Sequence, residues 1–225
     1  MKAVFELAVF NKASVSIAAH CNVDRIELCA DYSAGGITPS LEDFNQARKD
    51  FTGKIFVMIR LRPGNFVYSD AEFSTMLDAV SQFKLLGADG FVSGFLTIDN
   101  IVNTEQTKLF VEACAPYPVT FHRAIDECSN YMEAVESVVR CGVKRILSTG
   151  TAMSAFAGKE KLNEVQRKYA SDLIVLAGGS VRSAGLSSFL MDSLISEVHS
   201  AAIMDRNTDI ADFDEVKRIQ SILNG

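Results

Sequence analysis

The amino-acid sequence predicts an α/β fold of the TIM type, a closed (β/α)8 barrel that forms a single domain over residues 1–225. Short apolar runs alternate with longer amphipathic segments along the whole chain, which is typical of parallel strands separated by helices. There are eight such runs, the number that closes a barrel. The alternative is an open doubly wound sheet, but residues 10–13, after the first run, lack the glycine-rich phosphate loop common in that class.

The expected strands are rich in β-branched and aromatic residues and almost continuously apolar, as parallel strands covered by helices should be. They span residues 3–9, 25–29, 55–61, 90–95, 119–123, 145–148, 173–177 and 196–199. Helices are expected over residues 14–20, 39–50, 70–86, 105–113, 131–141, 159–169, 184–191 and 214–223.

Capping residues predict where several helices begin and end. Thr38 precedes Pro39, which suits an N-cap followed by a proline at the first helical position. Ser69 and Glu72 have the spacing of a capping box. Gly87 follows an expected helix, where a left-handed residue is often needed.

Composition and charge exclude several classes of function. Apolar residues make up 48% of the chain, enough for a large core. The formal net charge is −6 and there is no basic run, so nucleic acid and anionic membranes are poor partners. Glu6 interrupts the first apolar stretch, which argues against a signal peptide, and no apolar run reaches the ~18 residues of a membrane span. A metal ion or a small anion is the expected ligand, and homo-oligomerisation stays open.

The cysteines predict the redox compartment. They are odd in number and not closely spaced, which is typical of reduced thiols in a cytoplasmic protein rather than of a disulfide framework. The five are Cys21, Cys29, Cys114, Cys128 and Cys141.

Polar residues gather at the ends of the expected strands, often at alternate positions. Since side chains alternate between the two faces of a strand, the polar set of each strand shares one face, which we expect to point into the barrel. Near the upper mouth such residues can act on a ligand, and sites of this fold lie there. Two of the three histidines fall at strand ends and suit acid–base chemistry. The predicted catalytic residues are Glu6, Glu27, Arg60, His122, Arg123, Glu197 and His199.

A structural interpretation of the same residues stays open. Glu6, Glu27, Arg60 and Glu197 can form an internal ion-pair network instead of a site. A scaffold without chemistry is a third interpretation, although polar residues concentrated at one end argue against it.

Glycine-rich loops at the expected mouth predict an anion site. Residues 178–180, Gly178, Gly179 and Ser180, follow the seventh strand, where barrel enzymes often hold a phosphate with backbone N–H groups. We expect Arg60, Arg62 and Arg123 to supply a positive lining. Tight turns also need glycine, so a purely structural role for these loops stays open.

Several motifs resemble the copper homeostasis protein CutC family, and they occur in the order found in that family. They include His-Arg-Ala-Ile-Asp at residues 122–126 and Gly-Gly-Ile-Thr-Pro-Ser at residues 35–40. The resemblance covers almost the whole chain, through residues 24–29, 35–40, 58–64, 68–70, 119–126, 145–150 and 197–200.

The resemblance implies a TIM-type barrel, a cytosolic location and binding of Cu(I) by cysteines near the mouth. Cys29 occupies the cysteine of the family's Glu-Leu-Cys motif and is the expected copper ligand. Some members carry further cysteines where this chain has Ala8 and Ser200. Cys128 lies in the loop after the fifth strand, and the sequence leaves open whether it approaches Cys29.

Two functions therefore follow from the sequence. The first is copper handling, implied by the family. The second is a TIM-barrel isomerase, epimerase or lyase that acts on a small anionic metabolite. The sequence leaves open whether that metabolite carries a phosphate group. The converging carboxylates, histidines and arginines resemble acid–base machinery, and no lysine stands where a Schiff base would need it.

Overall fold

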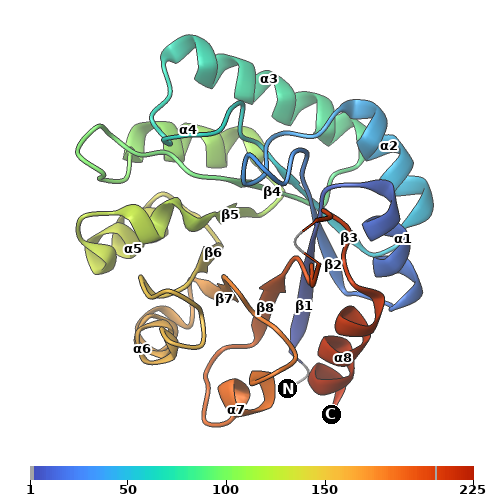
Figure 1. The fold of residues 1–225 in the computed structure, drawn as a ribbon. Helices are drawn as coiled ribbons and strands as arrows, with labels where there is room; N and C mark the ends of the chain where they lie inside the picture. Colours follow the sequence, from blue (N-terminus) through green and yellow to red (C-terminus); the bar gives the residue numbers. More distant parts are fainter. Residues whose placement is uncertain (1–2, 206) are drawn as a thin grey trace.

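Eight parallel strands close into a barrel in sequence order in the computed structural model, which describes residues 3–205 and 207–225. Helices surround the barrel on the outside (Figure 1). The strands are β1 (Val4–Val9), β2 (Arg25–Leu28), β3 (Lys54–Met58), β4 (Gly90–Ser93), β5 (Val119–Phe121), β6 (Arg145–Ser148), β7 (Ile174–Gly178) and β8 (Glu197–Ser200). The predicted fold class is confirmed.

Eight α-helices follow the strands in the described part of the chain. They are α1 (Lys12–His20), α2 (Leu41–Asp50), α3 (Asp70–Leu86), α4 (Thr104–Cys114), α5 (Tyr131–Arg140), α6 (Lys159–Tyr169), α7 (Leu186–Leu190) and α8 (Phe213–Asn224). A short 3-10 helix, η1 (Arg123–Glu127), begins one residue after β5, with His122 as its N-cap, so this strand is shorter than the sequence predicts. No helix in the described residues is long and apolar enough to cross a membrane.

The ends of α3 form as the sequence predicts. The Ser69 hydroxyl accepts the Glu72 amide, and the Glu72 carboxylate accepts the Ser69 amide, which completes the capping box. Gly87 ends the helix with φ of 90°, a left-handed conformation that costs a residue with a Cβ atom far more than it costs glycine.

The predicted start of α2 was wrong by two residues. The helix begins at Leu41, and its N-cap is Ser40, whose hydroxyl accepts the Asp43 amide at 3.0 Å. Thr38 instead binds Arg60, two residues beyond β3: its Oγ1 accepts the Arg60 amide at 2.8 Å, and its own amide donates to Arg60 O. A long-range backbone bridge therefore replaces the local cap.

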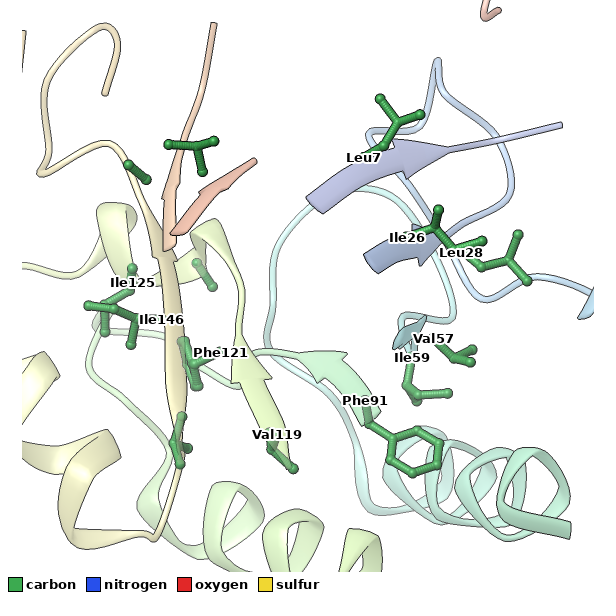
Figure 2. Close-up of a cluster of buried hydrophobic side chains, with 14 of the residues drawn as sticks. Leu7, Ile26, Leu28, Val57, Ile59, Phe91, Val119, Phe121, Ile125 and Ile146 are labelled. Carbon is green, nitrogen blue, oxygen red and sulfur yellow. The ribbon is translucent and has the colours of Figure 1, made fainter. Parts of the chain in front are cut away.

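Apolar side chains of one strand parity point away from the barrel axis and pack under the helices. Figure 2 shows this layer, in which Leu28, Val57 and Ile59 point outward and Phe91 packs toward α3. The opposite parity fills the inside of the barrel with a smaller cluster of Cys29, Phe56, Met58 and Val92. The charged residues predicted to face inward share this second parity, as the strand register requires.

Four charged side chains form a layer beneath the mouth, which we call the ionic floor: Glu6, Arg25, Arg145 and Glu197. Arg25 Nε binds Glu6, and Arg25 Nη2 lies 2.5 Å from Glu197 Oε2. Arg145 binds both oxygens of Glu197, at 2.7 and 3.0 Å. Both guanidinium groups also lie over the ring of Phe56, at 4.8 and 5.4 Å from its centroid. Buried charges need such partners, so this layer is a structural element of the barrel.

Candidate functional site

A cavity of about 630 Å³ opens at the C-terminal ends of the strands. Residues that directly follow β1, β2, β5, β6, β7 and β8 line it, which places it at the end of the barrel where TIM-type sites lie. The sequence-predicted residues that line it are Glu27, Cys29, Arg60, His122, Arg123, Gly179, Ser180 and His199.

The remaining predicted residues lie elsewhere. Glu6 and Glu197 belong to the ionic floor and do not line the cavity, so the predicted internal network exists with Arg25 and Arg145 in place of Arg60 and Glu27. A buried charge in the lower barrel is stable only when it is paired, and these partners neutralise both carboxylates.

Two further predicted residues have structural positions. Gly178 leaves room for its neighbours, because a Cβ atom there would lie 2.3 Å from Leu147 Cδ1 and 3.1 Å from His199 Cβ. Arg62 does not line the cavity as expected; its Nε lies 2.5 Å from Glu72 Oε1, and its Nη2 donates to Val67 O.

His199 connects the ionic floor to the cavity. Its Nδ1 lies 2.8 Å from Glu6 Oε1, and its Nε2 lies 3.8 Å from Glu27 Oε2. Burial disfavours the charged imidazole, but the hydrogen bond with Glu6 and the charges of Glu27 and Glu6 outweigh it and raise the pKa of His199. Burial also opposes ionisation of Glu6, yet Arg25 and His199 together lower its pKa to about 2. Glu6 thus stays ionised and orients the imidazole.

Glu27 is the titrating carboxylate of the cavity. Burial raises its pKa to about 7, and the charge of Glu6 acts in the same direction. Its Oε2 accepts a hydrogen bond from Cys29 Sγ at 3.6 Å, whereas its buried Oε1 has no partner among the described residues. A carboxyl group with a pKa near neutrality and a free oxygen suits a general base or acid.

His122 has the opposite protonation behaviour to His199. Burial lowers its pKa to about 3, and the charge of Arg60 acts in the same direction, so the ring is neutral near pH 7. Its Nδ1 accepts the Ala124 amide at 3.2 Å, which places the ring proton on Nε2. That Nε2 is buried and has no partner in the part of the chain that the structure describes.

Three arginines line the cavity, and two of them bind their own loops. Arg60 donates to the carbonyl oxygens of Ala34, Gly36 and Gly64, and so ties together the loops that follow β2 and β3. Arg182 donates to Val181 O, Ser200 Oγ and Ile203 O. These guanidinium groups hold the rim of the cavity in place.

Arg123 is available to a ligand. Its Nε donates to Asp126 Oδ2 at 3.2 Å, while its terminal nitrogens have no acceptor within residues 3–205 and 207–225. A Cβ atom added to Gly179, which has φ of 105°, would lie 3.7 Å from Arg123 Cζ and 2.3 Å from Thr149 Cγ2. Glycine here avoids a clash with the Thr149 side chain and tolerates the positive φ, while the Arg123 guanidinium lies beside this turn at an ordinary contact distance. Arg123, Thr149, Gly179 and Ser180 line one side of the cavity, and we call them the anion corner after the anion site that the sequence predicts at residues 178–180.

Sequence reasoning missed Asp126, which organises the anion corner. Its carboxylate accepts hydrogen bonds from Ser148 Oγ at 2.6 Å and from the amides of Thr149 and Thr151, as well as from Arg123. Its place in the motif at residues 122–126 was a signal, but the loop after β6 that it binds lies more than twenty residues away. Arg182 and Phe66 were also missed, because neither lies at a strand end.

The fold and the cavity together define a class of protein, a TIM-type barrel with ionisable groups and an anion corner at its mouth. A sequence model of the CutC family matches residues 3–204, and the chain belongs to this family.

Individual relatives support this assignment. CutC family proteins of Klebsiella pneumoniae and Salmonella schwarzengrund are 38% and 36% identical to the chain, over 89% of it and 80% of their own lengths. A CutC structure from Streptococcus agalactiae, whose description proposes copper homeostasis, is 25% identical with a TM-score of 0.82, over 88% of this chain and 98% of its own. Phosphoribosylanthranilate isomerase of Thermotoga maritima shares the fold alone, with a TM-score of 0.65 at 10% identity and 99% of both chains covered.

The donor set at the mouth does not match the thiolate ligands that Cu(I) prefers. Cys29 lines the cavity, but burial raises the pKa of its thiol well above the usual value, and the thiolate is the form that binds metal. Cys128 packs against the outer apolar layer, whereas Cys29 belongs to the inner cluster, so the two thiols lie in different layers of the barrel. The described residues contain no group of three His, Cys, Asp or Glu side chains arranged to hold a metal ion.

Proposed function

We propose that the mouth of the barrel catalyses proton transfer on a small anionic metabolite, as an isomerase, epimerase or lyase does. The Glu27–His199 pair carries the proposal. Glu27 Oε2 and His199 Nε2 lie 3.8 Å apart in one cavity, and the ionised carboxylate and the protonated imidazole carry opposite charges. The pKa of Glu27 is near neutrality. Efficient general acid–base groups have pKa values near the working pH, so this pair suits proton abstraction and return.

Each side chain has a distinct part in this proposal. Glu27 takes a proton from the substrate through its free Oε1, and His199 balances the charge of that carboxylate. Glu6 is a positioning residue, because it binds His199 Nδ1 from beneath and does not line the cavity. Arg123 and the backbone of Gly179 and Ser180 hold the anionic group of the substrate. None of the lining residues is a lysine, so the proposed chemistry proceeds without a Schiff base.

The cavity also fits the proposed size of substrate. Its volume of about 630 Å³ lies within the ~300–1,000 Å³ of common small-molecule sites. Since all five cysteines are free, we place this activity in the cytosol.

A thermal-shift screen against phosphorylated sugars and 2-oxo acids tests the proposal. A ligand that binds the folded state raises the melting temperature, and Arg123→Ala should abolish that shift. With a ligand in hand, Glu27→Gln should reduce turnover at least a hundredfold, on the scale of lost general base catalysis. Glu105→Gln changes an exposed carboxylate on the first turn of α4 and is the matched control. It should leave the ligand-induced melting-temperature shift and the turnover unchanged. Turnover that survives Glu27→Gln would refute the proposal.

Copper handling, named in the description of the Streptococcus agalactiae relative, is the alternative. It needs Cys29 as a ligand, and His122, whose buried Nε2 has no partner among the described residues, lines the same cavity. The protonated state of the Cys29 thiol favours the enzyme over this alternative.

A further inference from the structure

We infer that the substrate carries a carbonyl group next to the carbon that loses its proton, and that His122 Nε2 donates a hydrogen bond to the carbonyl oxygen. The inference rests on the proposed acid–base function and adds to it the class of substrate. It assigns His122 the part of a neutral electrophile, separate from that of the titrating His199.

The tautomer of His122 follows from its contacts. The Ala124 amide donates to Nδ1 at 3.2 Å, so the neutral ring carries its proton on Nε2. Burial keeps the pKa of the ring at about 3, and therefore the ring is a neutral donor over the physiological range. Its Nε2 is one of the buried polar atoms that lack a partner in the described chain. A buried donor of this kind is costly unless a ligand accepts its hydrogen bond.

The ring of His122 is held rigidly. Gly94 packs against one side: a Cβ atom there would lie 2.5 Å from His122 Cε1 and 2.6 Å from Nδ1. Phe66 packs on the ring with 4.8 Å between the ring centroids. A donor fixed in advance stabilises developing charge without reorganisation during the reaction, which is how oxyanion holes act.

Because the His122 ring is neutral, the substrate atom that accepts its hydrogen bond should also be neutral when the substrate binds. An anionic group gains more from the free guanidinium of Arg123 than from a neutral imidazole. A carbonyl oxygen, by contrast, is neutral when it binds and gains negative charge as the enolate forms. A neutral imidazole N–H matches that change, as it does in triosephosphate isomerase, where a neutral histidine polarises the carbonyl while a glutamate acts as the base.

Both unpartnered atoms then serve one reaction step. The Glu27 carboxylate takes the proton from the α-carbon through Oε1, and the C–H electron pair becomes the π bond between that carbon and the carbonyl carbon. The carbonyl π electrons move onto oxygen, where the hydrogen bond from His122 stabilises them. Where the α-carbon carries a hydroxyl group, the proton of that hydroxyl moves to the former carbonyl oxygen, and the proton on Glu27 returns to the former carbonyl carbon. These transfers leave a carbonyl group at the α-carbon and complete an isomerisation without any further reactant.

Matched ligand pairs test the inference by isothermal titration calorimetry. In each pair, one member mimics the planar enolate and the other keeps the anionic group but lacks an sp² oxygen at the reacting position. The pairs are 2-phosphoglycolohydroxamate with glycerol 3-phosphate, and oxalate with glycolate. In at least one pair the enolate mimic should bind at least tenfold more tightly, and His122→Phe should remove this preference while the second member still binds.

The outcomes separate this inference from the proposed function. Equal affinity within the pairs, or a preference that survives His122→Phe, would overturn the carbonyl inference and leave the acid–base proposal standing. If none of the four ligands binds the wild type, the proposed function fails together with the inference. Should His122→Phe not fold, NMR of the wild type labelled with ¹⁵N-histidine replaces it. The His122 Nε2 proton should then move downfield with the mimic and remain in place with its partner ligand.

Discussion

His199 faces Glu27 across the top layer of the barrel, with 3.8 Å between Nε2 and Oε2, while Glu6 binds the other nitrogen of the same ring. The imidazole therefore lies between a carboxylate that stays ionised and one that titrates near neutrality. The protonation of His199 at the mouth therefore depends on the charge of Glu6, which the solvent does not reach.

Glu6→Gln should lower the pKa of His199. The hydrogen bond and the charge of Glu6 both favour the imidazolium, and their loss leaves only the charge of Glu27 to oppose burial and the charge of Arg25. The titration of the His199 ring protons by NMR measures this change. His122 should remain neutral down to about pH 4 in both proteins. An unchanged His199 midpoint in the variant would contradict the positioning role of Glu6.

Glu27→Gln should reduce the loss of stability that accompanies rising pH. The folded pKa of Glu27 is raised from its ordinary 4.5 to about 7, so its contribution to stability is full below pH 4.5 and is lost as pH rises through 7. At 1.36 kcal/mol per pKa unit, the wild type should lose about 3 kcal/mol more than the variant between pH 4.5 and pH 8. Urea unfolding at the two pH values measures this, with Glu105→Gln as the control. Parallel curves for wild type and Glu27→Gln would show that Glu27 ionises normally in the folded protein.

Glu197→Gln should destabilise the fold, because it leaves Arg25 and Arg145 without their shared carboxylate. Breaking a buried ion pair by removal of one partner costs about 3–5 kcal/mol. Glu136→Gln breaks the exposed pair with Arg140 and should change the unfolding free energy by less than about 1 kcal/mol. Urea denaturation compares the two variants. Similar losses in both would mean that the ionic floor contributes no more than a surface pair.

Gly94→Ala should displace His122, since the new methyl group would overlap its ring. The preference for an enolate mimic should fall at least tenfold, while the anion corner still binds glycerol 3-phosphate. Gly87→Ala is a control for stability alone, because a Cβ atom there meets open space but the residue has φ of 90°. It should lower the melting temperature and leave ligand binding intact. Equal ligand affinities in Gly94→Ala and the wild type would argue against the packing role of Gly94.

Cu(I) titration under anaerobic conditions should give the same weak binding in the wild type and in Cys29→Ala. The Cys29 thiol is buried, protonated and separated from Cys128, so it offers Cu(I) no pair of thiolates. A competition assay with a chromophoric Cu(I) chelator measures both affinities. Loss of tight binding in Cys29→Ala would instead establish copper as the ligand.

Much of the fold could be predicted because its signals are local. The period-two alternation of residues 25–29 assigns Glu27 and Cys29 to the inner face of the barrel, and Ser69 and Glu72 define the start of α3. The start of α2 was misplaced, since Thr38 binds Arg60, twenty-two residues away and just beyond β3, instead of capping its own helix.

The sequence by itself determined which side chains face the barrel axis and at which end they gather. Only the tertiary structure decided what each of them does there. His122 and His199 occupy similar places in the sequence pattern, yet one has a lowered pKa and the other a raised one. Likewise, Arg60 donates to carbonyl oxygens of neighbouring loops. The terminal nitrogens of Arg123 have no acceptor in the described part of the chain and are therefore available to a ligand. Charge state and hydrogen-bond satisfaction depend on atoms that distant segments bring close, and no local pattern encodes those distances.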